Sequence, residues 1–392
     1  MLVLSILFNI NAWAANGPRD SLSVDFLGYQ VSVRPFSSNY PSKEGKNIHQ
    51  LSLDHEQWMQ SNLPSSLTDQ LRDIRKSRDL SDWFYYQLIR KIADAVLPKK
   101  QDYVGYTICK WYLLNETGYD AAILTSAERI MLYIRTNDMV YNQPVREING
   151  FQYTSLNFHD YGYTTEEGVA YTAILHSDHA NRNAFSFKID QLPQLPESAF
   201  ETKDLSFTYG GETQRLALKV SSVLKGIYTN YPVTEYANQF NIPINKETEA
   251  SLINALEPKI AQLDQKQGLT YLLDFTRYSF DFDRDTHVFG REKRLSPEET
   301  ILYEKSDCED RAALFFYLVK KLYNLPMIVL SYPSHINIGI VIDQPKGKGI
   351  AYKGKLYTIF EPTPQKKEYG IGQMDKTILK EGFEIVYEYL PN

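Results

Sequence analysis

Residues 306–319 of the chain read SDCEDRAALFFYLV, and this stretch decides the fold of the C-terminal part. The apolar residues over 312–319 have the spacing of a buried helix. Ser306 or Asp307 is a good N-cap, so Cys308 is expected in the first turn of that helix. Free backbone N–H groups and the helix dipole favour a thiolate there, which is the reactive form of cysteine.

Three carboxylates surround this cysteine in the sequence, Asp307, Glu309 and Asp310. Negative neighbours raise the pKa of a thiol and oppose the effect of the helix terminus. A thiolate at Cys308 therefore needs a nearby cation, and a histidine is expected to supply it.

The histidine follows in residues 335–342, which read HINIGIVI. Isoleucine occupies every second place, so these residues define one buried face of a strand. His335 lies on the opposite face, together with Asn337 and Gly339.

A second strand is expected over residues 354–361, GKLYTIFE. If the two strands pair as an antiparallel ladder centred near Lys348, His335 lies opposite Glu361. Asp343 is the other nearby acid, but at the usual rise of a strand it lies about 26 Å from His335. Glu361 is therefore expected to orient the imidazole.

A thiol at a helix start, a base on a strand and an acid that holds the base are the three roles of nucleophilic acyl transfer. In this order the residues resemble the transglutaminase-like superfamily of papain-type folds, and within it the bacterial exported cysteine protease or amidase group. The matching stretches are SPEET at 296–300, DCED at 307–310, SH at 334–335 and FEPT at 360–363.

The resemblance implies that residues 241–392 form a catalytic α+β domain with Cys308 as nucleophile, His335 as base and Glu361 as third residue. The family more often carries Asp in the third place, and Glu reaches one methylene further. The resemblance also implies an oxyanion site made by the Cys308 amide and a side chain from the preceding helix or loop. Tyr278 is the candidate for that side chain.

The rest of the chain divides into three further parts. Residues 1–15 form a short apolar run ending in Ala-Trp-Ala, which is typical of a secretory signal cut after Ala14. Residues 16–160 are expected to form an α+β domain. Residues 161–240 carry short strands separated by Gly, Pro and Asn, which predicts a small β-sandwich.

The N-terminal domain has the same order of elements as the C-terminal one. When His335 is aligned with Arg129, residues 328–330 fall on 122–124, and residues 357–358 fall on 153–154 after the loss of two positions. The triad positions then carry Asp102, Arg129 and about Asn157, which cannot perform the chemistry. Residues 60–160 are therefore either a degenerate copy of the catalytic fold or a chance similarity.

Other chemistry finds little support in the sequence. The only cysteines are Cys109 and Cys308, which could pair, although a buried structural role is expected for Cys109. Residues 281–292 carry acids at calcium-loop positions but have Thr286 where the turn needs glycine, so a solvated loop is expected. No phosphate-binding glycine loop or zinc motif occurs. We therefore expect no metal and no cofactor.

Composition excludes one class of partner. The net charge is −6 and the basic residues are scattered, so nucleic acid is not expected. No segment after the signal is long and apolar enough for stable membrane insertion, so the mature protein is expected to be periplasmic or secreted.

Two functions remain open. The first is an exported thiol enzyme that acts on peptide or protein amides, with cell-wall peptides among the candidates, by hydrolysis or transamidation. The second is a non-enzymatic envelope protein that binds a peptide or glycan on a transglutaminase-like scaffold.

Overall fold

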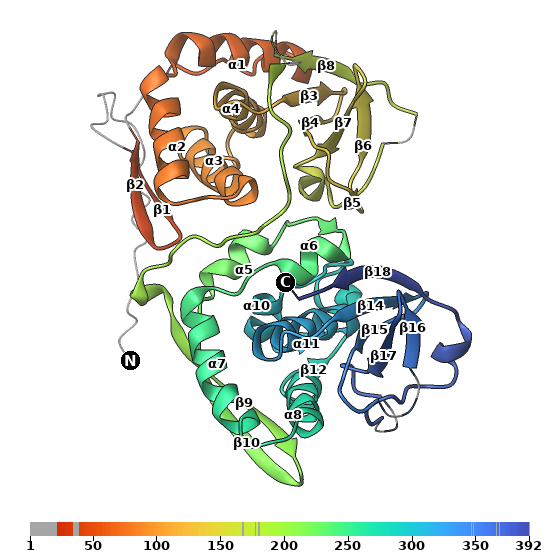
Figure 1. Ribbon diagram of the computed structural model, residues 1–392. Coiled ribbons are helices and arrows are strands. Elements are labelled where there is room, and N and C mark those ends of the chain that lie inside the picture. The colour runs from red at the N-terminus through yellow and green to blue at the C-terminus, as the bar shows by residue number, and fades with distance from the viewer. Residues whose placement is uncertain are drawn as a thin grey trace, which may run out of the picture.

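The computed structural model describes residues 22–33, 39–166, 168–176, 178, 181–345, 347, 349–365, 367 and 369–391. These residues form two lobes of mixed α+β structure, one above the other in Figure 1, as the sequence predicts for the fold class. The expected signal segment at residues 1–15 lies outside the described part. In the described part, no helix is both long and apolar enough to span a membrane.

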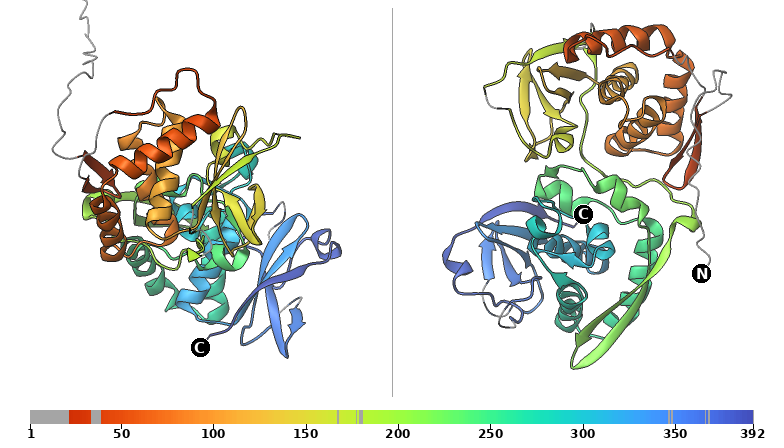
Figure 2. Two further views of the ribbon diagram at one scale, coloured as in Figure 1. Left: turned by 90° about the horizontal axis from the view of Figure 1, so that it is seen from above. Right: turned by 180° about the vertical axis from the view of Figure 1, so that it is seen from behind.

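The N-terminal lobe packs helices against one curled sheet (Figures 1 and 2). Its helices are α1 (Ile48–Asn62), α2 (Ser65–Ser77), α3 (Asp82–Val96) and α4 (Tyr103–Glu116). Its sheet contains β3 (Ala121–Thr125), β4 (Ile130–Arg135), β6 (Val145–Ile148), β7 (Phe151–Ser155) and β8 (Thr172–Leu175). A separate hairpin precedes α1, made of β1 (Leu22–Phe26) and β2 (Tyr29–Val33).

The predicted β-sandwich at residues 161–240 is wrong. Strand β8 joins the N-terminal sheet, and only β9 (Glu201–Tyr209) and β10 (Glu212–Val220) form a long two-stranded ribbon. The ribbon alternates buried and exposed residues as a sandwich strand would, but its buried face packs on helices of the C-terminal lobe. An alternating pattern of apolar and polar residues indicates that one face of a strand is covered, but it does not indicate whether a sheet or a helix covers that face.

Short elements lead from the ribbon into the C-terminal lobe. They are α5 (Val223–Tyr228), β11 (Val233–Thr234) and α6 (Tyr236–Asn241). Strand β11 pairs with β5 (Val140–Tyr141) of the N-terminal lobe, so the two lobes share a small sheet at this point.

The C-terminal lobe surrounds one buried helix, α11 (Cys308–Leu322). The other helices are α7 (Lys246–Ile260), α8 (Gln265–Tyr278), α9 (Asp285–Val288) and α10 (Pro297–Leu302). A short parallel pair joins β12 (Asp281–Phe282) to β13 (Lys305–Ser306). The large sheet contains β14 (Met327–Tyr332), β15 (His335–Ile340), β16 (Gly349–Tyr352), β17 (Lys355–Phe360) and β18 (Glu384–Tyr389).

The two large sheets have the same topology. Their strand orders are β6-β7-β4-β3-β8 and β16-β17-β15-β14-β18, and each sheet follows one long helix, α4 or α11. The registers also correspond, because Tyr133 pairs with Ser155 in the first sheet where Gly339 pairs with Ile359 in the second. Such agreement in order and register is the structural counterpart of the internal similarity in the sequence.

The register fixes which residues are equivalent. Arg129 precedes Tyr133 by as many residues as His335 precedes Gly339, and Asn157 takes the place of Glu361. The equivalent of Cys308 is Tyr103, because both are the first residue of their helix. The sequence alignment placed Asp102 there, one residue too early, since Asp102 is the N-cap and corresponds to Asp307.

The two lobes are packed together through a continuous apolar core. Trp83 of α3 is 2% exposed, and its indole nitrogen donates to the Ile227 carbonyl across the interface at 3.0 Å. Its ring also lies 5.2 Å from that of Tyr231. The lobes therefore share core residues and are not joined only by a linker.

We predict that Trp83→Ala lowers the free energy of unfolding by about 3–5 kcal/mol, because it leaves a large cavity at the lobe interface. Trp83→Phe serves as the matched control, since it keeps an aromatic ring and loses about 1 kcal/mol of hydrogen bonding. Urea unfolding followed by circular dichroism measures both. Two separate transitions, with only one affected by Trp83→Ala, would contradict a shared core.

Candidate active site

The helix start at Cys308 is built as the sequence predicts. Asp307 is the N-cap of α11, and the Asp310 carboxylate accepts a hydrogen bond from the Asp307 backbone N–H at 3.2 Å. Asp310 also accepts from the Leu295 N–H at 2.7 Å, so the preceding loop is tied to the first turn of the helix. Residues 310–316 of the helix are all buried, which fixes the position of its first residue.

The thiol of Cys308 is half-buried and donates a hydrogen bond to Glu309 Oε2 at 2.7 Å. Burial raises the pKa of this thiol, and the charges of Glu309 and Asp307 raise it further. In this arrangement Cys308 is a protonated thiol at neutral pH. A base must therefore remove the proton before the sulfur can attack.

His335 and Glu361 form the expected pair. The Nε2 atom of His335 lies 2.7 Å from Glu361 Oε2, and both side chains are buried. Burial lowers the pKa of the imidazole, but the hydrogen bond and charge of Glu361 raise it more, so its pKa lies above the usual value. Glu309 adds to this increase, so the same carboxylate acts on both the thiol and the imidazole.

The sequence predicted this pair for a partly wrong reason. The strands β15 and β17 do pair antiparallel, but Ile338 lies opposite Phe360, so the ladder is shifted by two residues from the expected register. The chain between them forms an additional edge strand, β16, on the far side of β17. Continuing the observed register places Glu361 opposite Asn337, and Glu361 reaches His335 along the diagonal.

Several donors hold the Glu361 side chain. Its Oε1 accepts from the Thr363 N–H at 3.0 Å. The Asn337 amide, turned so that its nitrogen faces acceptors, donates to Oε2 at 3.0 Å. The side chain of Arg277 donates to the Glu361 backbone carbonyl at 2.7 Å. The acid is therefore fixed from three directions and in turn fixes the imidazole.

Tyr278 does not lie with these residues. It ends helix α8 and lines a cavity of about 770 Å³ together with Asp274 and Tyr369, and Cys308 is not part of that lining. Successive helix residues point about 100° apart, so Arg277 can reach Glu361 while Tyr278 turns to the other side. The proposal that Tyr278 completes an oxyanion site is therefore corrected.

Tyr236 is a phenol that interacts electrostatically with the thiol. It is the first residue of α6, and its hydroxyl is hydrogen-bonded to the Ser331 side chain and close enough to interact electrostatically with Cys308. Burial raises the pKa of Tyr236, so its O–H keeps the proton. The Arg294 guanidinium stacks 3.7 Å from the centre of its ring and restrains it. The sequence analysis missed Tyr236 because the domain boundary was set at residue 241.

A second cluster of acids lies under the site. Asp285, Asp307 and Asp310 are buried and bring one carboxylate oxygen each within 4.8 Å of the others. Burial and mutual repulsion raise the pKa of Asp285 to about 8 and that of Asp307 to about 9, so the cluster retains protons at neutral pH. A cation could be held by the same oxygens.

The acids of the calcium-like segment do not converge. Only Asp285 joins the buried cluster, whereas Asp283 pairs with Lys305 at 2.8 Å and Asp281 is exposed. The expected solvated loop therefore describes Asp281 and Asp283 but not Asp285, which is buried.

The equivalent place in the N-terminal lobe is filled. The Asn157 amide donates to the Tyr103 hydroxyl at 2.8 Å, and that hydroxyl donates to Asp160 at 2.9 Å. Arg129 is directed to Glu166, with 3.5 Å between nitrogen and oxygen. This lobe has neither a thiol nor an imidazole at the three positions.

Both cysteines are free, so the alternative of a disulfide is excluded for the described structure. Cys109 is fully buried in α4, and burial raises its pKa to about 12. Its role is structural, as the sequence predicts.

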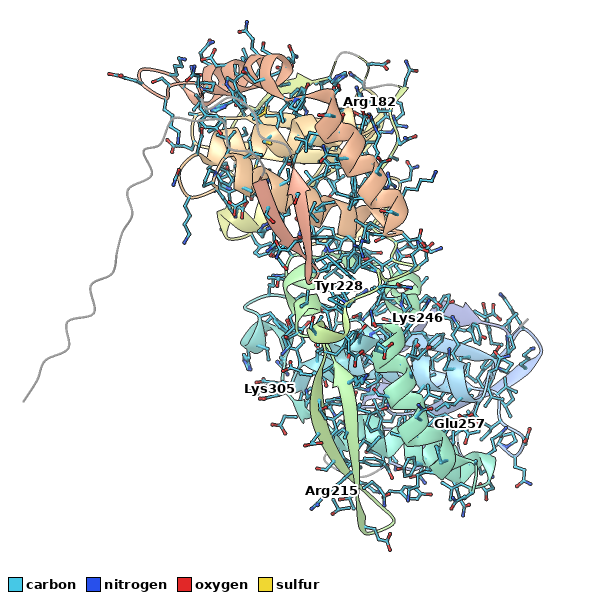
Figure 3. The ribbon with its side chains drawn as sticks, turned by 90° about the vertical axis from the view of Figure 1, so that its left-hand side faces the viewer. Arg182, Arg215, Tyr228, Lys246, Glu257 and Lys305 are labelled. Atoms are coloured by element: carbon cyan, nitrogen blue, oxygen red, sulfur yellow. The ribbon has the colours of Figure 1, made fainter. Side chains whose placement is uncertain are left out.

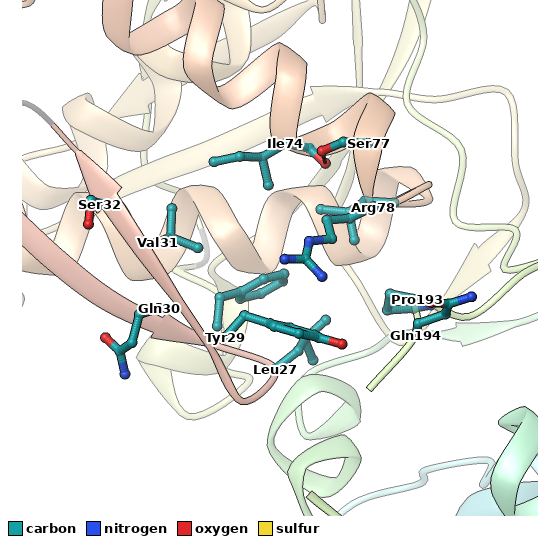
Figure 4. A pocket seen from close by; sticks show the side chains of 12 residues that line it. Leu27, Tyr29, Gln30, Val31, Ser32, Ile74, Ser77, Arg78, Pro193 and Gln194 are labelled. Atoms are coloured by element: carbon teal, nitrogen blue, oxygen red, sulfur yellow. Dashed lines mark hydrogen bonds between the residues drawn. The ribbon is translucent and has the colours of Figure 1, made fainter. Parts of the chain in front are cut away.

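A cavity of about 250 Å³ lies between the β1–β2 hairpin and α2, and Figure 4 shows the side chains that line it. Its main polar feature is Arg78, whose guanidinium stacks 3.8 Å from the ring centre of Tyr29. No nucleophilic cysteine, histidine or carboxylate lines it. The chemically competent side chains are those around Cys308.

Comparison with known proteins gives no further guidance. No family model, no curated protein and no solved structure matches the chain. Functional assignment therefore depends on the geometry of the site.

We predict that Asp285→Asn stabilises the protein at pH 8 by about 1–4 kcal/mol, as is found when buried charges are neutralised. The folded-state pKa of Asp285 is about 8 against 3.8 for the free group, so its contribution is fully present below about pH 3.8 and is lost as the pH rises toward 8. Thermal unfolding at pH 4 and pH 8 measures the difference, which should shrink at pH 4. Asp281→Asn, at an exposed position, is the control. Equal unfolding temperatures for Asp285→Asn and the parent protein at pH 8 would refute the assignment.

Proposed function

We propose that this protein is a cysteine-dependent acyl-transfer enzyme of the transglutaminase-like type, acting on peptide or protein amides. The observation that carries the proposal is the buried His335–Glu361 pair, 2.7 Å between Nε2 and Oε2, in the same lobe as a half-buried thiol at a helix start. Glu361 binds Nε2, so Nδ1 is the nitrogen left to accept a proton from Cys308.

The reaction follows from these roles. The imidazole takes the thiol proton, and the sulfur attacks the amide carbonyl to form a C–S bond. The C–N bond then breaks, and the leaving amine takes the proton from the imidazole. Water or a second amine attacks the thioester, which releases the acyl group and restores the thiol.

Stabilisation of the oxyanion is assigned to two donors. One is the Cys308 backbone N–H at the free end of α11, and the other is the Tyr236 hydroxyl, which interacts electrostatically with Cys308. Both lie in a site that is largely removed from water, where a hydrogen bond to a developing negative charge is strongest.

The N-terminal lobe is proposed to be a second, inert copy of the same fold. Its support is the shared strand order and register, together with the hydrogen-bonded Tyr103 and Asn157 at two of the three catalytic positions. A phenol with its hydroxyl already bonded to Asn157 and Asp160 offers no nucleophile.

A non-enzymatic binding protein is the second candidate. It is favoured by one observation, which is that Cys308 donates to Glu309 and is therefore held as a thiol in the resting structure. Alkylation of the thiol separates the two functions.

We predict that iodoacetamide labels Cys308 at neutral pH and that His335→Ala lowers the labelling rate about 10²-fold or more, the usual contribution of a general base. His287→Ala is the matched control, since His287 is exposed at the surface of the same lobe. Mass spectrometry of the modified peptide gives the rates. A thiol that remains unlabelled, or labelling that is indifferent to His335, would favour the binding protein.

We also predict that Tyr236→Phe separates acylation from alkylation. Loss of one oxyanion donor should slow release of p-nitrophenolate from p-nitrophenyl acetate about 10²-fold. Iodoacetamide labelling creates no oxyanion, so its rate should change by less than about threefold. Cys308→Ala gives the background rate of ester hydrolysis. Equal losses in both reactions would show that Tyr236 only maintains the structure around the thiol.

A further inference from the structure

The charge around the thiol indicates which amides the proposed enzyme accepts. Two carboxylates, Asp307 and Glu309, lie close to Cys308, and a third, Glu292, interacts electrostatically with both of them. The Oε2 atom of Glu309 is 2.7 Å from the sulfur, and one carboxylate oxygen of Asp307 lies within 4.8 Å of both of these residues' ligand atoms. The charge of Glu309 raises the pKa of Glu292, and the charge of Glu292 raises the pKa of Asp307. Glu292 and Glu309 are both half-buried and form no salt bridge with Lys or Arg in the described part of the chain.

The basic groups nearby are already committed to the protein. Arg294 stacks on Tyr236 and donates to the Thr234 carbonyl at 2.9 Å. Arg291 donates to the Thr229 carbonyl at 2.7 Å and stacks on Tyr163 of the other lobe. Neither guanidinium forms a salt bridge with Glu292 or Glu309 in the described part of the chain, although the charge of Arg294 lowers the pKa of Glu292 against the larger effects of burial and Glu309.

One acceptor in this group has no partner. Asp307 is 8% exposed, and its Oδ1 atom makes no hydrogen bond within the described residues. A buried oxygen of this kind is costly unless a donor from another molecule reaches it. An ammonium group has three N–H donors and a positive charge, which match the carboxylates of Glu309 and Glu292, and Asp307 Oδ1 offers a further acceptor.

We infer that the site takes amide substrates that carry a positive charge next to the scissile bond, such as the amino group of a lysine or another diamino acid residue, and that Glu292 and Glu309 hold this group. The inference rests on the proposed function and adds a substrate class to it. When the ammonium binds, Glu309 accepts a hydrogen bond from the ligand in place of the one from the Cys308 thiol. The Cys308 proton is then free to move to His335, so binding of the correct substrate prepares the nucleophile.

The test uses charged thiol reagents, so no natural substrate is required. The thiolate attacks the sulfenyl sulfur of a methanethiosulfonate, the S–S bond forms, the bond to the sulfonyl group breaks, and methanesulfinate leaves with the electron pair. The thiol proton passes to His335 or to water. Rates are measured with the 2-aminoethyl reagent, the neutral methyl reagent and the 2-sulfonatoethyl reagent, each divided by its rate with glutathione.

We expect the normalised rate of the cationic reagent to exceed that of the neutral one about tenfold or more, which corresponds to about 1.4 kcal/mol. The anionic reagent should be the slowest. Glu292→Gln and Glu309→Gln should each reduce the cationic preference at least threefold, by removing one attractive charge close to the sulfur. Glu304→Gln, at an exposed site on the same lobe, is the charge-matched control and should keep the preference.

Two results would overturn the inference. One is equal normalised rates for the three reagents, or a preference that Glu292→Gln leaves unchanged. The other is loss of the preference in millimolar calcium chloride together with a raised unfolding temperature, which would assign the carboxylates to a metal ion. Failure of the proposed function looks different, because reaction with the neutral reagent would then not depend on His335.

Discussion

The buried guanidinium of Arg311 links the segments that carry Cys308 and Glu361. It is fully buried in α11 and donates to the Ser306 hydroxyl and to the carbonyls of Arg277 and Phe280, at 3.1, 2.6 and 2.8 Å. Burial lowers its pKa to about 10, so it stays charged at neutral pH. Arg277 in turn donates to the Glu361 carbonyl. The start of α11, the end of α8 and the segment that carries Glu361 are therefore linked through two arginines. Loss of either arginine would leave buried carbonyls without hydrogen-bond donors, and each such carbonyl would cost its full desolvation penalty.

Within this frame the thiol is subject to opposing effects. The helix terminus and the imidazole favour a thiolate at Cys308, whereas burial and the charge of Glu309 favour the neutral thiol. In this structure the neutral thiol is favoured, because Cys308 donates a hydrogen bond to Glu309. His335 is held ready by Glu361 on its other nitrogen. A cation that occupies the carboxylates would take Glu309 from the thiol and so raise the reactivity of Cys308 above its resting level.

The two lobes share one strand order but differ in the side chains at the three equivalent positions. The equivalents of Cys308 and Glu361 are Tyr103 and Asn157, and these two are bonded directly to each other. The phenol of Tyr103 lies between the start of α4 and the segment after β7, so these three positions serve the packing of the N-terminal lobe. The sequence indicated this copy through the alignment of Arg129 with His335, but it assigned the helix position one residue too early. Cap residues and first helical residues are adjacent in sequence, and only backbone geometry separates them.

The sequence by itself determined the chemical inventory and the local structure. It identified the helix that begins at Cys308, the strand that begins at His335 and the acid at Glu361, because capping and alternation depend on neighbours in the chain. Tertiary structure decided the rest. The register that joins the two strands is shifted by two residues, the ribbon at 201–220 packs on helices instead of a second sheet, and Tyr236 comes close enough to the thiol to interact with it electrostatically. Each of these depends on contacts between segments far apart in sequence, whose free energies are set by shape and burial in three dimensions and leave no periodic signal in the chain.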